Sequence, residues 1–542
     1  MLQPLLLSSL LQRAARHAGD VEIVSRRVEG DIHRYTYADC HARAMQLANA
    51  LTACGIQPGD RIGTLAWNGY RHMELYYGVA GIGAVCHTIN PRLFPDQIAY
   101  IINHAGDRTL CFDSSFLALV EQVAPMCPQV QNWIMLCDDT ACPATFKVPL
   151  QSYETFIGGH PQQFTWPIFD EREAAVLCYT SGTTGDPKGV LYSHRSLSLM
   201  AYASAMPDAF NLSANDAIAP VVPMFHVNAW GLPFSAALTG AKLVMPGPKL
   251  DADSLFELFE QERVTFTAGV PTIWLGLADY MRRTGKRTEV PMRAVVGGAA
   301  CSPQLATSLR NCGITAIHAW GMTEMSPLGT VCSPSRTYAD LPADDRARVE
   351  AKQGRAIAGI DLKVVGANGE ELPWDGQSAG DLMARGHWVI DRYFGADKCA
   401  LQDGWLPTGD VATIDVNGCM QITDRSKDII KSGGEWISSI ELEGIALMHP
   451  EITMAACIAC EHPKWDERPL LIAVRRPDST LTAPELLAFY GGRVAKWWIP
   501  DDVVFVSELP LTATGKLQKL ALRQRFSQHF VELVHLSRTP AG

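Results

Sequence analysis

The 542-residue sequence lacks a long apolar run. No stretch reaches the roughly 18 apolar residues of a membrane-spanning helix, although the segment Met1–Leu11 is rich in leucine. No basic residues precede that segment, which argues against a signal peptide. We therefore expect an amphipathic first helix. Arg13 and Arg16, with no acidic residue before Asp20, keep an organelle transit peptide as the alternative.

Positive charge is in short supply. The chain carries 46 Lys and Arg against 57 Asp and Glu, a net charge of −11. Nucleic-acid binding needs a basic surface, so we expect no nucleic-acid partner. Small anionic ligands stay open, because a few local amides and lysines suffice for them.

The cysteines show no paired spacing. They are 15, an odd number, and scattered, which favours the reducing cytoplasm over a disulfide framework. Cys457 and Cys460 form one CxxC in an apolar strand-like run with no second pair nearby. Two buried thiols are therefore expected rather than a zinc or redox site, although His462 follows.

Strand-like runs alternate with helical patterns over the first 320 residues or so, a length that holds more than one domain. Examples of the strand-like runs are 61–66, 174–179, 241–245 and 293–297. This alternation predicts βα units with largely parallel sheets. Between about 340 and 424, frequent Gly and Asp with turn signals predict a small antiparallel barrel or sheet.

We expect a multidomain chain of α/β and α+β type. Residues 1–424 would form a large N-terminal domain of two βα-type sheets plus the small β-barrel. Residues 425–430 would form a hinge, at the charged stretch Asp424–Asp428. Residues 431–542 would form a smaller, mobile α+β domain.

The densest cluster of glycines and hydroxyls follows the run 174–179. Its expected phosphate ligands are Thr180, Ser181, Gly182, Thr183, Thr184, Gly185 and Lys188. Glycines let the backbone approach a ligand closely, and amides, hydroxyls and one lysine suit an oligophosphate. A Walker A loop needs Gly, four residues, then Gly-Lys-Ser/Thr. Counting from Gly182, the second glycine and the hydroxyl after the lysine are missing, so a P-loop NTPase is not expected.

The loop resembles the signature loop of the adenylate-forming superfamily, which comprises acyl-CoA synthetases, luciferases and peptide-synthetase adenylation domains. Four more motifs follow in family order. Trp320–Glu324 resembles the aromatic-Gly-x-Thr-Glu motif, and Thr408–Asp410 resembles the ribose-binding TGD. Asp424–Glu435 resembles the hinge motif, and Thr512–Lys516 the catalytic-lysine motif. The resemblance covers nearly the whole chain and implies an enzyme that uses ATP.

The resemblance implies further ATP-site residues. Outside the loop, the expected ATP or AMP contacts are Gly298, Ala299, Ala300, Trp320, Gly321, Met322, Thr323, Asp410 and Arg425. Glu324, with Thr180, is expected to hold Mg²⁺, which prefers hard oxygen ligands. Asp410 can accept both hydrogen bonds of a ribose diol, and Arg425 donates as a planar fork. Trp320 stands where the family usually has Tyr and would cover adenine.

The resemblance also implies a two-step cycle. Lys516 is expected to be catalytic, its ammonium stabilising the charge that builds between the attacking carboxylate and the α-phosphate. The C-terminal domain would then rotate about Lys427. That motion would replace Lys516 by a CoA-side face at Gly433, Gly434 and Trp436.

The segment Pro223–Gly231 bears on the acid. Amino-acid-activating domains place an Asp here for the α-amine, but non-acidic residues follow His226. The segment resembles that of fatty acyl-CoA synthetases, in which a tryptophan gates the acyl tunnel. Trp230 and Gly231 are therefore expected at a tunnel and His226 at the catalytic centre. A buried structural Trp230 is the alternative.

The sequence thus predicts an AMP-forming acyl-CoA ligase with ATP, Mg²⁺ and CoA. A medium- or long-chain fatty acid is the expected substrate. A short thioether acid resembling 3-methylthiopropionate or an aryl acid is the alternative, and a related enzyme that does not use CoA is a more distant one. A cytoplasmic protein without a transmembrane segment is expected, and a homodimer is left open.

Overall fold

The computed structural model describes residues 3–180, 187–333, 341–432, 435–462, 464–511 and 517–530. The chain forms two compact units. Unit 1 comprises Met1–Asp361 and Ala384–Leu406, and unit 2 comprises Leu362–Met383 and Pro407–Gly542. The domain boundaries expected from the sequence, with a hinge at 425–430, stay a prediction.

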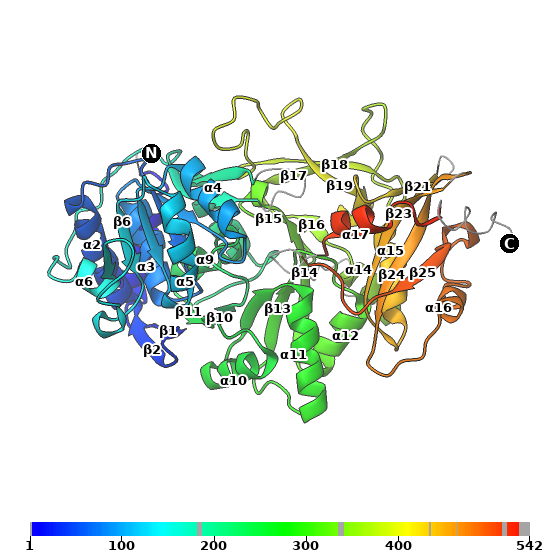
Figure 1. Ribbon diagram of the computed structural model, residues 1–542, viewed down its shortest axis with the longest axis horizontal. Coiled ribbons are helices and arrows are strands. Elements are labelled where there is room, and N and C mark those ends of the chain that lie inside the picture. The colour runs from blue at the N-terminus through cyan, green and yellow to red at the C-terminus, as the bar shows by residue number, and fades with distance from the viewer. Residues whose placement is uncertain are drawn as a thin grey trace. The chain divides into compact units, whose positions relative to one another are not determined.

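The first sheet of unit 1 carries the predicted phosphate loop. Across the sheet the strands are β7 (Leu150–Ser152), β6 (Asn132–Met135), β5 (Thr109–Phe112), β3 (Arg61–Leu65), β4 (Val85–Thr88), β8 (Ala174–Tyr179) and β9 (Gly189–Ser193). All neighbours are parallel except β8 and β9, which form an antiparallel hairpin. Helices α4 (Pro95–Ala105) and α5 (Leu117–Val123) pack their apolar residues on β5 and β6 (Figure 1).

The second sheet of unit 1 is also largely parallel, as expected. Its strands run in the order β16 (Gly354–Ala356), β15 (Leu328–Val331), β14 (Ile314–Gly321), β13 (Met292–Val296), β12 (Phe266–Gly269), β10 (Ala217–Pro220), β11 (Lys242–Met245), β1 (Glu22–Arg26) and β2 (Ile32–Thr36). From β14 to β1 every pair is parallel. Helices α10 (Ala252–Glu262), α11 (Pro271–Thr284) and α12 (Pro303–Asn311) cover one face (Figure 1).

Helix α3 (Tyr70–Gly81) lies between the two sheets. It contacts β4 and β8 of the first sheet and β1 of the second, and all its residues are buried. Helices α1 (Leu7–His17) and α2 (Tyr37–Ala53) pack on it, and Phe234 of α9 (Leu232–Thr239) stacks on Tyr76 of α3. Helix α9 in turn packs on α1 and on α7 (His194–Ala205). The amphipathic first helix is confirmed, since Leu7, Leu10 and Leu11 of α1 are buried. None of the described helices combines the length and apolarity needed to cross a bilayer.

In unit 2, the small closed barrel expected over 340–424 is not found among the described residues. Strands β17 (Ile360–Val365), β18 (Gly380–Gly386), β19 (Leu406–Ile414) and β20 (Cys419–Arg425) follow one another in an open sheet with β17 at its edge. Residues Ala343–Glu350 form helix α14 instead of a strand. Because β17 ends the strand order, the sheet does not close on itself, and the predicted turns join neighbouring strands of an open sheet.

The rest of unit 2 is the expected α+β region. Its second sheet has the order β22 (Glu435–Ile437), β21 (Ile430–Ser432), β24 (Asp466–Arg475), β23 (Ile452–His462), with β25 (Asp502–Phe505) also paired to β24. Helices α15 (Ser439–Met448) and α16 (Ala483–Phe489) pack on one side and α17 (Lys519–Phe526) on the other. Cys457 and Cys460 are buried free thiols on β23, as predicted.

Candidate active site

The predicted phosphate loop joins β8 to β9. Its two ends are tied together: the Thr180 N–H donates to the Lys188 carbonyl at 2.9 Å, and the Lys188 N–H donates to Thr180 Oγ1 at 3.4 Å. The loop begins at Thr180, directly after the carboxyl end of β8. Parallel sheets commonly bind ligands at this edge. The expected phosphate ligands from Ser181 to Gly185 lie outside the described residues.

The predicted magnesium ligand Glu324 follows β14 in a tightly held turn. A Cβ on Gly321 would lie 1.9 Å from the Pro327 carbonyl oxygen, so only glycine fits there. The Tyr192 hydroxyl donates to the Thr323 carbonyl at 2.7 Å. This contact ties the turn to β9, the strand that leaves the phosphate loop.

The Glu324 carboxylate is mostly buried, with 8% of the residue exposed. Its Oε1 accepts a hydrogen bond from the Tyr393 hydroxyl at 2.8 Å. Among the described residues no Lys or Arg pairs with this carboxylate, and no hydrogen bond engages Oε2. A carboxylate that is held by one hydrogen bond at Oε1 and leaves Oε2 open to a ligand fits Mg²⁺. Thr180 as a second ligand stays a prediction.

Trp230 sits on a left-handed turn. Val227 to Trp230 have φ values from 45° to 55°, and Gly231 follows at 76°. Non-glycine residues pay about 1–2 kcal/mol each for this conformation, and such strain is concentrated at functional sites. The half-buried indole lies against Gly297, where a Cβ would approach it to 2.9 Å. The structure thus places the predicted gate beside the exposed turn 298–300, predicted to contact adenine.

Trp320 is more buried than an adenine-stacking side chain needs to be. It is 7% exposed, and its ring covers Gly329, where a Cβ would lie 2.6 Å from the indole. On the same strand, His318 accepts from the Cys301 N–H at 3.3 Å and donates from Nδ1 to the Ala351 carbonyl at 2.9 Å. Burial lowers the pKa of His318 to about 4, so the imidazole is neutral and supports the turn before Cys301.

Helix α3 and the residues before it hold the segment that carries His226 and Trp230. The Asn68 amide donates to the Pro220 and Val222 carbonyls at 2.7 and 3.0 Å, and its oxygen accepts from the Met224 N–H at 2.6 Å. Two tyrosine hydroxyls of α3 hold the same segment. That of Tyr76 donates to the Met224 carbonyl at 2.5 Å, and that of Tyr77 donates to the Pro233 carbonyl at 3.2 Å. Half-buried His226 lies within the span so supported.

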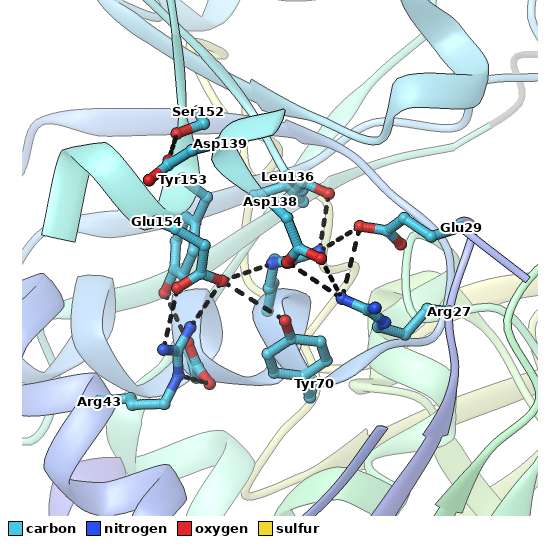
Figure 2. Close-up of polar contacts among 12 residues, drawn as sticks. Arg27, Glu29, Arg43, Tyr70, Leu136, Asp138, Asp139, Ser152, Tyr153 and Glu154 are labelled. Atoms are coloured by element: carbon cyan, nitrogen blue, oxygen red, sulfur yellow. Dashed lines mark hydrogen bonds and ion pairs between the residues drawn. The ribbon is translucent and has the colours of Figure 1, made fainter. Parts of the chain in front are cut away.

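Helix α3 is itself anchored by a network of charged side chains, here called the α3 network (Figure 2). Two of them, Arg71 and Glu74, are buried. Its charged members are Arg27, Glu29, Arg43, Arg71, Glu74, Asp138 and Glu154. Arg43 binds Glu154 through two 3.0 Å contacts and Glu74 at 2.8 Å. Arg71 joins Glu154 at 2.9 Å and Glu29 at 2.9 Å. The pairs connect α2, α3 and α6 (Tyr153–Ile157). The helix that holds the segment Pro223–Gly231 is therefore itself tied to two other helices of unit 1.

In unit 2, the predicted ribose ligands lie side by side. Asp410 and Arg425 are cross-strand partners on β19 and β20, with Arg425 Nε 3.4 Å from Asp410 Oδ1. Gly409, at φ 74°, makes the bend before Asp410. The side chain of Asp410 is 8% exposed and that of Arg425 is 46% exposed. The pair offers an acceptor and a donor together, as a ribose site requires.

The predicted hinge residue Lys427 lies in a turn between β20 and β21, and burial lowers its pKa. Its carbonyl accepts from Arg523 at 3.4 Å, and Arg523 also pairs with Asp428 at 2.5 Å. These contacts fasten α17 to the turn. Lys516, Gly433 and Gly434 lie outside the described residues, and Trp436 belongs to β22, opposite Lys431 on β21.

A second buried cluster, the Lys519 cluster, comprises Asp424, Ser439, Glu443 and Lys519. Lys519 Nζ lies 2.7 Å from Glu443 Oε1 and 2.7 Å from Ser439 Oγ. Asp424 accepts from the Ser439 N–H at 2.5 Å and from its hydroxyl at 2.9 Å. The cluster fixes the helix that follows the catalytic-lysine motif to the start of the hinge motif.

Tyr393, His318, Asn68 and both clusters escaped prediction from the sequence. Tyr393 lies outside the short motifs, and nothing local marks it. Arg71 and Glu74, both buried on α3, are a weak signal, since such residues are almost never buried unpaired. Their burial itself, however, is known only from the fold.

Comparisons with known proteins extend over nearly the whole chain. The AMP-binding enzyme family matches residues 10–394, and the AMP-binding enzyme C-terminal domain matches 441–516. A 3-methylmercaptopropionyl-CoA ligase of Ruegeria lacuscaerulensis is 51% identical over 97% of this chain and 98% of its own. A medium-chain-fatty-acid–CoA ligase of Ectopseudomonas oleovorans is 50% identical over 97% of each chain.

Among solved structures, an anthranilate CoA ligase in complex with anthranoyl-AMP superposes with a TM-score of 0.84. Its sequence identity is 23%, over 98% of this chain and 99% of its own, so this likeness shows the fold alone. The predicted acid–CoA ligase class agrees with the family match and the named relatives and is confirmed. The chain belongs to the AMP-binding enzyme family.

Proposed function

We propose that the protein is an AMP-forming acyl-CoA ligase whose preferred acid is a medium-chain fatty acid. The carboxylate attacks the α-phosphorus of ATP, giving an acyl-adenylate and pyrophosphate. The thiol of CoA then attacks the acyl carbon and releases AMP. Mg²⁺, when bound, neutralises charge on the phosphates.

Each step assigns work to residues of the chain. Thr180 and Lys188 position the phosphates, and Glu324 offers an oxygen to the metal. Asp410 and Arg425 hold the ribose. Lys516 stabilises the charge of the first transition state. These assignments rest on the motifs and, for the residues that the structure describes, on their geometry.

The observation that carries the choice of acid is the setting of Trp230. The indole lies on Gly297, at the predicted adenine turn, and the left-handed turn beneath it contains no charged side chain. An apolar acyl chain is the ligand that such a segment accepts. The relative at 50% identity is a medium-chain-fatty-acid–CoA ligase.

A second candidate acid comes from the relative at 51% identity, a 3-methylmercaptopropionyl-CoA ligase. Its acyl group is short and apolar, so it also suits the setting of Trp230. An aryl acid stays a third alternative.

The test measures CoA-dependent AMP release with acetate, butyrate, octanoate, palmitate, benzoate and 3-methylthiopropionate. Each methylene that enters an apolar tunnel is worth about 0.8 kcal/mol, so KM should fall about fourfold per methylene and level off near octanoate. A lower KM for 3-methylthiopropionate than for octanoate would favour the second candidate.

Variants in the catalytic motif test the two-step assignment. Lys516→Ala should lower pyrophosphate formation at least a hundredfold, because it removes a transition-state charge contact. CoA transfer from supplied acyl-adenylate should persist. Lys427→Pro should do the reverse, because proline removes one hinge conformer. Equal losses in both half-reactions would contradict the assignment.

The compartment and the oligomeric state also belong to this proposal. The unpaired cysteines suit the reducing cytoplasm. Light scattering of the purified protein would distinguish a monomer from the homodimer that the sequence leaves open.

A further inference from the structure

Tyr393 contacts two predicted ATP-site residues at once. It lies in the segment that follows β18, far from both in the sequence. Its hydroxyl donates to Glu324 Oε1 at 2.8 Å, and Lys188 Nζ lies 5.0 Å from the centre of its ring. One side chain therefore links the predicted metal ligand to the predicted phosphate-binding lysine.

The backbone around Tyr393 is fastened on both sides. The Ile390 N–H donates to the Glu324 carbonyl at 3.0 Å, and the Phe394 N–H donates to the Gly189 carbonyl at 2.8 Å. A Cβ on Gly189 would lie 2.9 Å from Phe394 Cβ, so the two segments of the chain are in contact here. Residues 390–394 thus bridge the turn of Glu324 and the strand after the phosphate loop, which holds Tyr393 in place.

The hydroxyl of Tyr393 is a dependable donor. A phenol has an ordinary pKa of about 10 and carries its proton at neutral pH, so the hydroxyl donates to the carboxylate, at 2.8 Å. Donation to Oε1 orients the carboxylate and leaves Oε2 without a partner among the described residues. Residues that orient metal ligands in this way commonly change metal affinity about 10–100-fold when they are removed.

We propose that Tyr393 is a positioning residue for Mg·ATP, whose hydroxyl orients Glu324 toward the metal and whose ring holds Lys188 toward the phosphates. The inference rests on the proposed function, since it presupposes ATP at this site. The two contacts are separable. The hydroxyl serves the metal, whereas the ring serves the lysine.

Calorimetric titration of the full-length protein with ATP, once in Mg²⁺ and once in EDTA, tests both contacts without turnover. Tyr393→Phe keeps the ring and should reduce the Mg²⁺-dependent gain in ATP affinity about tenfold, with the affinity in EDTA unchanged. Tyr393→Leu should in addition weaken ATP binding in EDTA about two- to fivefold, the worth of an exposed cation–π contact.

Controls separate positioning from folding. Tyr202→Phe removes the hydroxyl of an exposed tyrosine and should change neither affinity. In a Glu324→Gln background, Tyr393→Phe should have no further effect on the Mg²⁺-dependent gain. This coupling is expected of a residue that acts through Glu324, whereas a general loss of stability would add in both backgrounds.

A gain in Tyr393→Phe within twofold of that in the unmodified protein would overturn the inference, provided that Glu324→Gln reduces it. If Glu324→Gln leaves the gain unchanged, Glu324 is not a metal ligand and the inference falls with it. The proposed function is tested apart from this, by AMP release from the unmodified protein with the panel of acids.

Discussion

The two units bury charge in different ways. In the α3 network of unit 1 (Figure 2), each carboxylate meets an arginine. Arg43 pairs with two carboxylates, and Arg71 pairs with three. In the Lys519 cluster of unit 2, one lysine serves both Glu443 and Asp424. The first arrangement is balanced by planar, multidentate cations, and the second by a single point charge.

The imbalance shows in the protonation of the carboxyls. Burial disfavours the charged form of Glu154, but Arg43 and Arg71 outweigh it and lower its pKa. Burial raises the pKa of Glu443 and of Asp424, and Lys519 opposes this without cancelling it. The comparison indicates that the arginines of the α3 network keep Glu154 charged, whereas the carboxyls of the Lys519 cluster take up protons more readily.

The largest effect is expected from Arg43→Met. Among the described residues Arg43 is the only cation paired with Glu74, whose side chain is fully buried. Leaving that charge unpaired should cost about 3–5 kcal/mol. Hydrogen exchange should show the loss in the amides of α2 and α3. The exposed Arg348→Met, whose side chain is 80% exposed, should change protection by less than about 0.5 kcal/mol and serves as the control.

Lys519→Met should cost less, about 2–3 kcal/mol at pH 7, because burial raises the pKa of both carboxyls that it leaves behind, Glu443 and Asp424, so that they can protonate. Arg43, by contrast, also serves Glu154, whose pKa is lowered. The loss should shrink at pH 5.5, measured by hydrogen exchange in α15 and α17. Adding Glu443→Gln should restore most of the stability. A loss that is the same at both pH values would contradict the difference between the clusters.

Trp230→Ala tests whether the segment held by α3 selects the acid. If Trp230 gates a tunnel, the gain of about 0.8 kcal/mol per methylene should flatten across acetate, butyrate and octanoate, while the KM for ATP stays the same. If Trp230 is instead a core residue, its substitution should cost about 3–5 kcal/mol of the protein's stability and leave the dependence of kcat/KM on acid length unchanged. The melting temperature and kcat/KM for the three acids distinguish these outcomes.

The smallest effect is expected from acidification to below about pH 4. The lowered pKa values of Glu154 and Asp138 mean that the unfolded chain binds protons more readily, so their contribution to stability is lost as pH falls below about 4. Glu74, whose pKa burial raises, opposes this in part.

The raised pKa values of Glu443 and Asp424 have the opposite sign, since their contribution is present at low pH and lost as pH rises. Hydrogen exchange should therefore show α2 and α3 loosening before α15 and α17 on acidification. The reverse order would contradict the assigned signs.

Motifs in the sequence were enough to predict the family and the cosubstrates, and the alternation of strand-like and helical runs was enough to predict the parallel sheets. The reason is that phosphate binding uses local backbone chemistry: glycines, hydroxyls and a lysine within one loop, and an acidic residue after a strand. The amphipathic pattern of α1 and the buried thiols of β23 are equally local, and both predictions are confirmed. Over the residues that the structure describes, the small closed barrel was wrongly predicted, because turn signals mark hairpins and do not say whether the outer strands meet.

Only the tertiary structure decided which side chains support the site. Arg43 and Glu154 are 111 residues apart and Arg71 and Glu154 are 83 apart, so no local pattern pairs them. Tyr393 and Glu324 are 69 residues apart and meet because residues 390–394 are hydrogen-bonded both to Glu324 and to Gly189, at the start of β9. Hydrogen bonds and ion pairs act through space over about 3 Å, whereas sequence patterns record only what neighbours along the chain require.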